Sequence, residues 1–246
     1  MKKIVAIILL LTSIFTFSSC NSDKQPFVCI SDKVADKVFT LNETPFTSEQ
    51  IDKINTVLDT GKKTRLEIDE TGRLYYGNGN IDMSSAQSDI HTTEKQAVQI
   101  AEDYLRSMDL LPSDDYAVDV FDLHTIYFRH TYDDIPIFAE DNQEGIYIGF
   151  TGEGLGSLDY RWSTVTPVES GSQIRITLSE AKQLYLDYME EKYGDHPEIG
   201  VPSKVPYQQI YIYGNGESAP YYLFSDEEPF LNSVFVNAVT GDITEW

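Results

Sequence analysis

Apolar and polar residues recur with two different periods along this chain, and these periods divide it into segments that each combine a helix with strands. Apolar positions three or four apart predict an amphipathic helix, and apolar positions two apart predict a strand with one buried face. Glycines, prolines and polar clusters mark the turns between these stretches. On this basis we predict a helix with a hairpin over residues 47–82, a second segment over 92–170 and a third over 171–246.

The first segment is small. Its predicted helix runs from Ser48 to Leu58 and ends before Gly61. A hairpin follows, with strands over residues 65–68 and 73–76 around an Asp-Glu-Thr-Gly turn. The run from Tyr76 to Gln87 is rich in Gly, Asn and Ser, which is typical of a linker.

The second and third segments follow one plan, in which a capped helix precedes several strands. Thr93 is the predicted N-cap of the helix in the second segment, and Thr177 or Ser179 is that of the helix in the third. One shift along the chain superposes Thr93 on Thr177 and Ala97 on Ala181, and each alanine lies on the apolar face of its helix. This similarity indicates a weak internal duplication, although two unrelated segments of ordinary α+β type also fit it.

The stretches after each helix alternate as strands do. They are residues 116–121, 125–132, 145–150 and 157–166 in the second segment and 207–213, 221–224 and 233–238 in the third. A helix with one apolar face next to antiparallel strands is expected to lie across one side of their sheet. The predicted fold class is therefore α+β, with two tandem units that each have a helix on an antiparallel sheet, preceded by the helix-and-hairpin segment.

The N-terminus predicts export. Two lysines precede an uncharged apolar run over residues 4–17, which is shorter than the roughly 20 residues of a membrane-spanning helix. Two serines stand directly before Cys20, an arrangement that resembles a bacterial lipobox, in which the cysteine is lipidated. We expect a signal peptide over 1–19 and a tether with an N-terminal extension over 20–46, with the protein anchored to the cell membrane through Cys20 and facing outside the cytoplasm. The alternative is an ordinary signal peptide with a chance cysteine.

Composition limits the partners of the chain and the means of its stabilisation. The 246 residues are 41% hydrophobic, which is enough for one large domain or two small ones. With 40 acidic and 18 basic residues the net charge is −22, so nucleic acid is not an expected partner. This charge attracts cations or basic proteins, and it also serves solubility. Cys29 is the second of two cysteines, so a lipidated Cys20 leaves it without a disulfide partner.

Two stretches resemble known families. Residues 128–138, Phe-Arg-His-Thr-Tyr-Asp-Asp-Ile-Pro-Ile-Phe, with 145–148 after them, resemble the hairpin motif of fungalysin–thermolysin propeptides. Residues 234–243, Val-Phe-Val-Asn-Ala-Val-Thr-Gly-Asp-Ile, and the Ser-Glu-Ala that opens the third helix resemble a PepSY domain. Asp133-Asp134 is a candidate turn, and Pro136 suggests an edge strand or a bulge. The resemblance covers about residues 92–246.

The resemblance implies a binding or regulatory role. In these families such segments bind an adjacent protease and inhibit it or assist its folding, but this sequence has no H-E-x-x-H motif of such a protease. The expected partner is therefore a separate extracytoplasmic protein, such as a protease or a sensor. The layout is also broadly similar to that of the YycH and YycI proteins, which are membrane-attached regulators of a sensor kinase.

The sequence does not predict catalysis or a cofactor. The four histidines, His91, His124, His130 and His196, lack the spacing of a zinc site, and there is no G-x-S-x-G motif for a nucleophilic serine. The glycines between residues 152 and 156 lack the Lys-Ser/Thr of a phosphate loop and predict a hairpin turn. Acidic residues between 133 and 144 do not follow the order of a calcium-binding loop, so solvated loops explain them as well as calcium does. We therefore expect no enzyme activity and no metal site.

Aromatic residues in the third segment suggest a binding face. The candidates are Tyr207, Tyr211, Tyr213, Tyr222 and Phe224. The first three share one side of a predicted strand, while Ile210 and Ile212 lie on the other. A strand with large residues on both sides is either buried on both or displays aromatic rings to a ligand. Two binding hypotheses therefore stand beside core packing: a protein partner bound through a sheet face or edge, and a glycan bound or cleaved in a cleft of tyrosines and carboxylates.

Overall fold

The computed structural model describes residues 26–58, 63–79, 93–113, 116–139, 144–151, 154–168, 174–194, 204–225 and 233–245. Within them are three helices, α1 (Ser48–Val57), α2 (Glu94–Ser107) and α3 (Leu178–Tyr193). The strands of the N-terminal part are β1 (Phe27–Cys29), β2 (Phe39–Asn42), β3 (Thr64–Ile68) and β4 (Leu74–Asn78). Those of the middle part are β5 (Tyr116–Asp122), β6 (Thr125–Tyr132), β7 (Ile135–Ala139), β8 (Gly145–Thr151), β9 (Gly154–Arg161) and β10 (Thr164–Pro167). The C-terminal part contains β11 (Val205–Gly214), β12 (Glu217–Phe224), β13 (Val234–Asn237) and β14 (Ile243–Glu245).

Each helix begins with the same local device. The side chain of a threonine just before the helix accepts a hydrogen bond from the backbone N–H three residues later. The side-chain oxygen of that later residue accepts one from the threonine backbone N–H, which completes a capping box. The pairs are Thr47 with Gln50, Thr93 with Gln96, and Thr177 with Glu180. The predicted caps are thereby confirmed, and in the third segment Thr177 rather than Ser179 is the cap.

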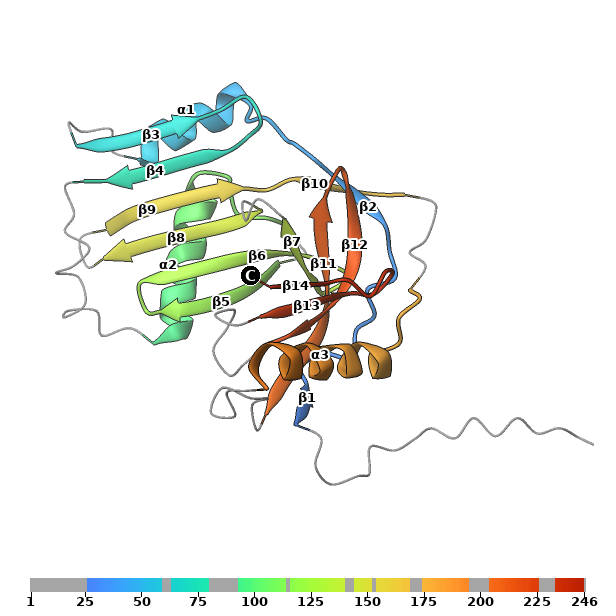
Figure 1. The fold of residues 1–246 in the computed structure, drawn as a ribbon. Helices are drawn as coiled ribbons and strands as arrows, with labels where there is room; N and C mark the ends of the chain where they lie inside the picture. Colours follow the sequence, from blue (N-terminus) through green and yellow to red (C-terminus); the bar gives the residue numbers. More distant parts are fainter. Residues whose placement is uncertain are drawn as a thin grey trace, which may run out of the picture.

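The first sheet has the strand order β5-β6-β8-β9-β4-β3. In Figure 1, α2 crosses behind its strands, so the face toward the reader lies away from α2. One core joins α1 and α2 to this sheet. It contains Ile54 of α1, Leu105 of α2 and Phe128 of β6, all fully buried. The helix and hairpin predicted over 47–82 therefore share the core of the second segment, because β4 pairs with β9.

The second sheet surrounds the long strand β11. Strands β12, β13 and β14 follow it on one side, and α3 packs on them through the buried Ala181 and Tyr185. On the other side of β11, β1 pairs in parallel with its beginning. The chain that emerges from the predicted tether is thus fixed to the second sheet.

Strand β7 joins the first and second sheets into one 12-stranded sheet of the described residues. It pairs antiparallel with β6 at Tyr132–Ile135 and in parallel with β11 from Ile137 onward. Asp133 and Asp134 form the β6–β7 turn with φ of 54° and 64°, which confirms the predicted polar turn. The expectation of an edge strand is wrong: β7 has neighbours on both sides, and Pro136 is accommodated because the pairing with β11 begins after it.

The α+β class is confirmed, with a large, mostly antiparallel sheet. The second and third segments are continuous through β7, and a two-stranded ribbon of β2 and β10 runs across their junction (Figure 1). No described helix is long and apolar enough to span a membrane.

Candidate functional site

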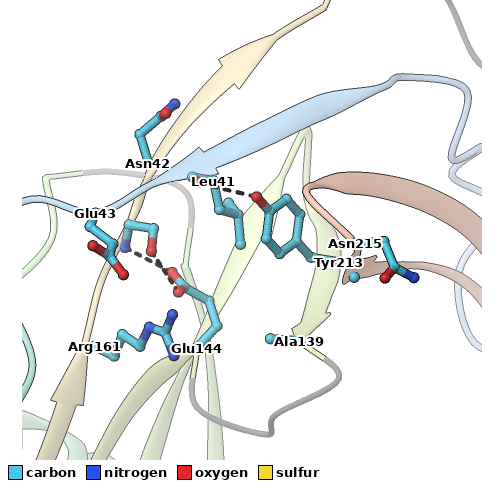
Figure 2. A pocket seen from close by; sticks show the side chains of 10 residues that line it. Leu41, Asn42, Glu43, Ala139, Glu144, Arg161, Tyr213 and Asn215 are labelled. Carbon is cyan, nitrogen blue, oxygen red and sulfur yellow. Dashed lines mark hydrogen bonds between the residues drawn. The ribbon is translucent and has the colours of Figure 1, made fainter. Parts of the chain in front are cut away.

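A cavity of about 520 Å³ lies where the two sheets meet. Its lining comes from β2, from the ends of β7, β9 and β11, and from the residues beside β8 and β10; it consists of Leu41, Asn42, Glu43, Ala139, Glu144, Arg161, Ser163, Tyr213, Gly214 and Asn215. In Figure 2, Glu43, Arg161 and Glu144 lie beside one another, with Tyr213 and Asn215 across from them.

The carboxylate of Glu144 is the buried centre of this junction. It accepts hydrogen bonds from the backbone N–H of Ser163 at 2.9 Å and from the Ser163 hydroxyl at 2.9 Å, and its Oε1 lies 2.7 Å from Nδ1 of His130. The side chains of Glu144 and His130 are only 2% and 5% exposed. Three segments that are separate in the sequence therefore meet at one buried carboxyl group, whose hydrogen bonds offset the cost of its burial.

The local chain is shaped to place this carboxylate. Gly145, directly after Glu144, has φ of +127°, and a Cβ there would lie 2.5 Å from the ring of Tyr127. The Tyr127 hydroxyl donates to the Glu144 carbonyl at 2.7 Å, and the His130 ring stacks on Trp162 at 4.2 Å. Only glycine adopts this backbone conformation without strain and leaves room for the tyrosine.

These residue types occur in hydrolases, but their order differs here. In a nucleophilic triad the imidazole contacts the serine hydroxyl and the carboxylate lies behind the imidazole. Here the carboxylate of Glu144 stands between Ser163 and His130, and the Ser163 hydroxyl donates its hydrogen bond to the carboxylate and not to the imidazole. Because both carboxylate oxygens already accept hydrogen bonds, Glu144 is also poorly placed to pair with Glu43 for glycoside cleavage. The arrangement is that of a structural tie within the first sheet, since it links β6, the start of β8 and the connection between β9 and β10.

The aromatic face predicted from the third segment is corrected by the structure. Tyr211 and Phe224 are fully buried and Tyr222 is 3% exposed, so these three belong to the core. Tyr207 and Tyr213 are half-buried; Tyr207 lies beside Phe27 of β1, and Tyr213 lines the junction cavity. The reason is that α3 and β1 cover the side of β11 and β12 that carries Tyr207, Tyr222 and Phe224.

Tyr211 is held by an extensive set of contacts. Its ring packs at 5.0 Å against Phe39 next to Ile137 of β7. Its hydroxyl accepts a hydrogen bond from the backbone N–H of Lys37 at 3.2 Å. Burial raises the pKa of this phenol to about 12.

The remaining predicted residues do not gather at one site. Cys20, His91, His196 and the acidic residues 140 and 141 lie outside the described residues. Asp134 pairs with Lys33 at 2.8 Å, and Cys29 is exposed in β1. The described part of the chain has no group of three or more His, Cys, Asp or Glu side chains that could hold a metal ion.

A second surface lies on the first sheet, on the side away from its core. We name it the aromatic row: one residue from each of six neighbouring strands, in register, namely Asp119, Tyr127, Tyr147, Asp159, Tyr75 and Glu67. Tyr147 and Tyr75 are 43% and 39% exposed. In each of the six strands, the residues directly before and after the member of the aromatic row point into the core, because side chains alternate between the two faces of a strand.

Phe121 joins this row through a bulge. The pairing of β5 with β6 shifts register between Val120 and Asp122, which leaves Phe121 as the extra residue. Its ring is 45% exposed and stacks on that of Tyr147 at 6.0 Å and 6°, and Tyr147 stacks in turn on Tyr127 at 4.2 Å. Bulges commonly re-aim a side chain in this way.

Ion pairs accompany the rings of the aromatic row. Arg73 lies 3.4 Å from Asp159, and Arg65 pairs with Glu67 at 2.8 Å while its guanidinium sits 5.3 Å from the centre of the Tyr75 ring. A depression of about 380 Å³ beside Tyr75 is lined by Arg65, Glu67, Ile68, Asp69, Arg73 and Tyr75. Sequence reasoning named none of these residues as a site.

Comparison with known proteins yields similarity of structure alone. No protein-family model and no curated protein sequence matches the chain. It is similar to the crystal structure of YycH from Bacillus subtilis, with 12% identity and a TM-score of 0.48 over 85% of this chain and 52% of that one. It is also similar to the YpeB C-terminal domain of Bacillus megaterium, with 11% identity and a TM-score of 0.40 over 82% of this chain and 98% of that one. The chain thus spans about half of the YycH structure, and at these values neither similarity carries a functional conclusion.

Proposed function

We propose that this chain is a non-enzymatic, extracytoplasmic lipoprotein that binds and regulates a secreted or membrane protein, such as a protease or a sensor. The observation that carries the proposal is the outer edge of β3. Within the described residues β3 pairs with β4 alone, so its second side offers backbone groups to a partner strand. Binding by strand addition needs no pocket and fits the propeptide-like resemblance.

The hydrogen bonds of the β3–β4 hairpin show which groups point outward. Gly79 N–H donates to the Lys63 carbonyl, and Asp69 N–H donates to the Arg73 carbonyl, so the odd-numbered residues of β3 face β4. Backbone groups alternate along an antiparallel strand. The N–H and C=O of Leu66, in the middle of β3, are therefore directed away from β4.

The other open edges are less suitable for a partner strand. The bulge at Phe121 interrupts β5, and such irregularities protect an edge from pairing. The edge strand β14 has only three residues. In contrast, β3 is regular over five residues, and Leu66 and Ile68 on it are only half-buried against the core, so an added strand would cover them further.

We further propose that residues 92–170 and 171–246 are two PepSY-like units. The equivalence of their helices supports this division: Thr93 and Thr177 both begin a capping box, and Ala97 and Ala181, four residues later, are both fully buried. Lipidation at Cys20 would hold the protein at the membrane through the tether. Converting Cys20→Ala should release the protein into the soluble fraction, and continued membrane association of that variant would contradict the anchor.

The strand-addition mode is tested with one substitution and a matched control. In Leu66→Pro, an outward donor is lost without removing a β3–β4 hydrogen bond. Leu66→Ala removes a comparable part of the side chain but keeps the N–H. A photo-crosslinker at Glu67, with another at Gln183 on the exposed face of α3 as control, reports the contact in cells.

We expect crosslinks to one protein from position 67 that disappear in Leu66→Pro and persist in Leu66→Ala. Equal crosslinking from both positions, or equal loss in both Leu66 variants, would show that β3 is not the contact.

A further inference from the structure

We propose that the aromatic row binds a neutral, β-linked glycan chain, with Tyr147 and Tyr75 stacking on sugar rings and the charged residues between them binding hydroxyl groups. This inference goes beyond protein binding at the β3 edge. It concerns the face of the first sheet and not its edge, and the two proposals can fail separately.

The exposed rings are concentrated on this face. The large apolar side chains that the structure shows as exposed fall into two groups, one of them Val28, Ile30 and Val34 near the N-terminus. The other is Tyr75, Phe121 and Tyr147 on the open face of the first sheet, and all three of its members are aromatic. The ring of Tyr147 stacks on the buried ring of Tyr127, so its position is already fixed before binding.

Strand spacing sets the distance between the two tyrosines. Tyr147 and Tyr75 both pair with Asp159, one from each side, so a single strand separates them. Neighbouring strands lie about 4.8 Å apart, so the two residues are about 10 Å apart across the sheet, close to the repeat of two sugar rings in an extended β-1,4-linked chain. Alternate sugars of such a chain present the same C–H face to the protein, so both rings can stack on one chain.

The residues between and beside the rings have the chemistry that sugars need. A sugar hydroxyl both donates and accepts hydrogen bonds, so a carboxylate next to a guanidinium satisfies neighbouring hydroxyls. Asp159, which lies between the two tyrosines in the sheet, and Arg73, two residues before Tyr75, provide this pair, and their side chains are 40% and 33% exposed. The depression beside Tyr75, with Arg65 and Glu67, extends the surface for a further sugar.

Other polymers fit this surface less well. A protein interface has an apolar core depleted in charge, whereas here ion pairs separate the rings, and covering them with apolar side chains would cost desolvation energy. An anionic polysaccharide would be repelled by a chain of net charge −22. A neutral chain of hydroxyl groups avoids both costs.

The test is calorimetric titration of the protein from Asn21 onward with chitotetraose and cellotetraose, and with maltotetraose as the control ligand. Maltotetraose is equally neutral, but its α-linked chain curls and does not repeat at the required distance. We expect a β-linked tetrasaccharide to bind more tightly than its disaccharide. Maltotetraose should bind at least roughly tenfold more weakly than the β-linked tetrasaccharide.

Three variants locate the site. Tyr147→Ala and Tyr75→Ala should each weaken binding at least roughly tenfold, as loss of a central aromatic contact does. Tyr147→Phe keeps the ring and should bind as the parent does, while Ile30→Ala removes an exposed apolar side chain elsewhere and should have no effect. Circular dichroism of every variant establishes that the fold is intact.

Absence of binding to both β-linked tetrasaccharides would overturn the proposal. So would equal binding of maltotetraose, or unchanged affinity in a folded Tyr147→Ala. A protein partner that crosslinks to position 147 in place of glycan binding would assign this face to the regulatory function.

Discussion

Replacing Glu144 with alanine tests whether its buried carboxylate holds together β6, the start of β8 and the connection between β9 and β10. The substitution removes the acceptor of two buried donors, the backbone N–H and hydroxyl of Ser163, and the buried hydrogen-bond partner of Nδ1 of His130. Each hydrogen bond to a charged group contributes about 1.5–3 kcal/mol, and the donors left behind are expensive to bury. Water from the adjoining cavity offsets part of this loss.

We therefore expect Glu144→Ala to lower the free energy of unfolding by about 3–5 kcal/mol, which is the range for removing one partner of a buried charged pair. Since a domain is typically stable by about 5–15 kcal/mol, this is a large fraction of the total. The matched control is Glu43→Ala in the same cavity, which removes an exposed carboxylate and should change stability by less than about 0.5 kcal/mol.

Equilibrium urea unfolding measures both variants. Trp162 stacks on His130, so tryptophan fluorescence follows the junction once the other tryptophan is removed as Trp246→Phe in every variant. Circular dichroism of the helices follows α1, α2 and α3, and the two transitions coincide if the sheets unfold together. A loss below about 1 kcal/mol in Glu144→Ala, at an unchanged dependence on urea, would refute the idea that this carboxylate ties these strand ends together.

Three further predictions concern stability. Thr177→Ala removes the capping box of α3 and should cost about 1 kcal/mol in thermal or urea unfolding, whereas Thr177→Ser should be nearly neutral; equal effects would contradict the capping role. Gly145→Ala should lower the free energy of unfolding by more than the strain of about 1–3 kcal/mol expected for a positive φ, because its Cβ would also meet the ring of Tyr127. Gly216 also has a positive φ but open space around it, so Gly216→Ala reports the strain alone in the same urea assay. Burial raises the pKa of Tyr211 from its usual 10 to about 12, so the neutral phenol stabilises the folded state below pH 10 and this contribution is lost as the pH rises through 12. Tyr211→Phe should therefore show a shallower decline of stability between pH 10 and 12, and an unchanged slope would show that Tyr211 does not titrate in this way.

Turn and cap positions were within reach of sequence reasoning because they depend on neighbouring residues. The helix starts at Thr93 and Thr177 follow from side chains that reach only three residues along the chain. The Asp133-Asp134 turn is equally local. The β11–β12 turn was overlooked, although Asn215-Gly216 is a strong hairpin signal and both residues have positive φ.

Strand order lay beyond the sequence. Phe121 and Tyr147 were both placed in strands, and Tyr75 in the hairpin, but only the pairing of β4 with β9 and of β9 with β8 aligns Tyr75 and Tyr147 around Asp159. The buried Glu144 shows the same limit: its partners His130 and Ser163 are 14 and 19 residues away, and nothing in their spacing reveals that they meet.

The sequence by itself determined the fold class, the helix caps, the alternation of the strands and the net charge, because each depends on composition or on residues close together in the chain. The tertiary structure decided which alternating face is buried. Tyr211 and Tyr147 both lie in strands with apolar neighbours, yet packing against Phe39 and Ile137 buries one, while the other lies on a face turned away from the first sheet's core. The burial of a strand's face is set by what packs on it from distant parts of the chain, and that choice appears only when the sheets are assembled.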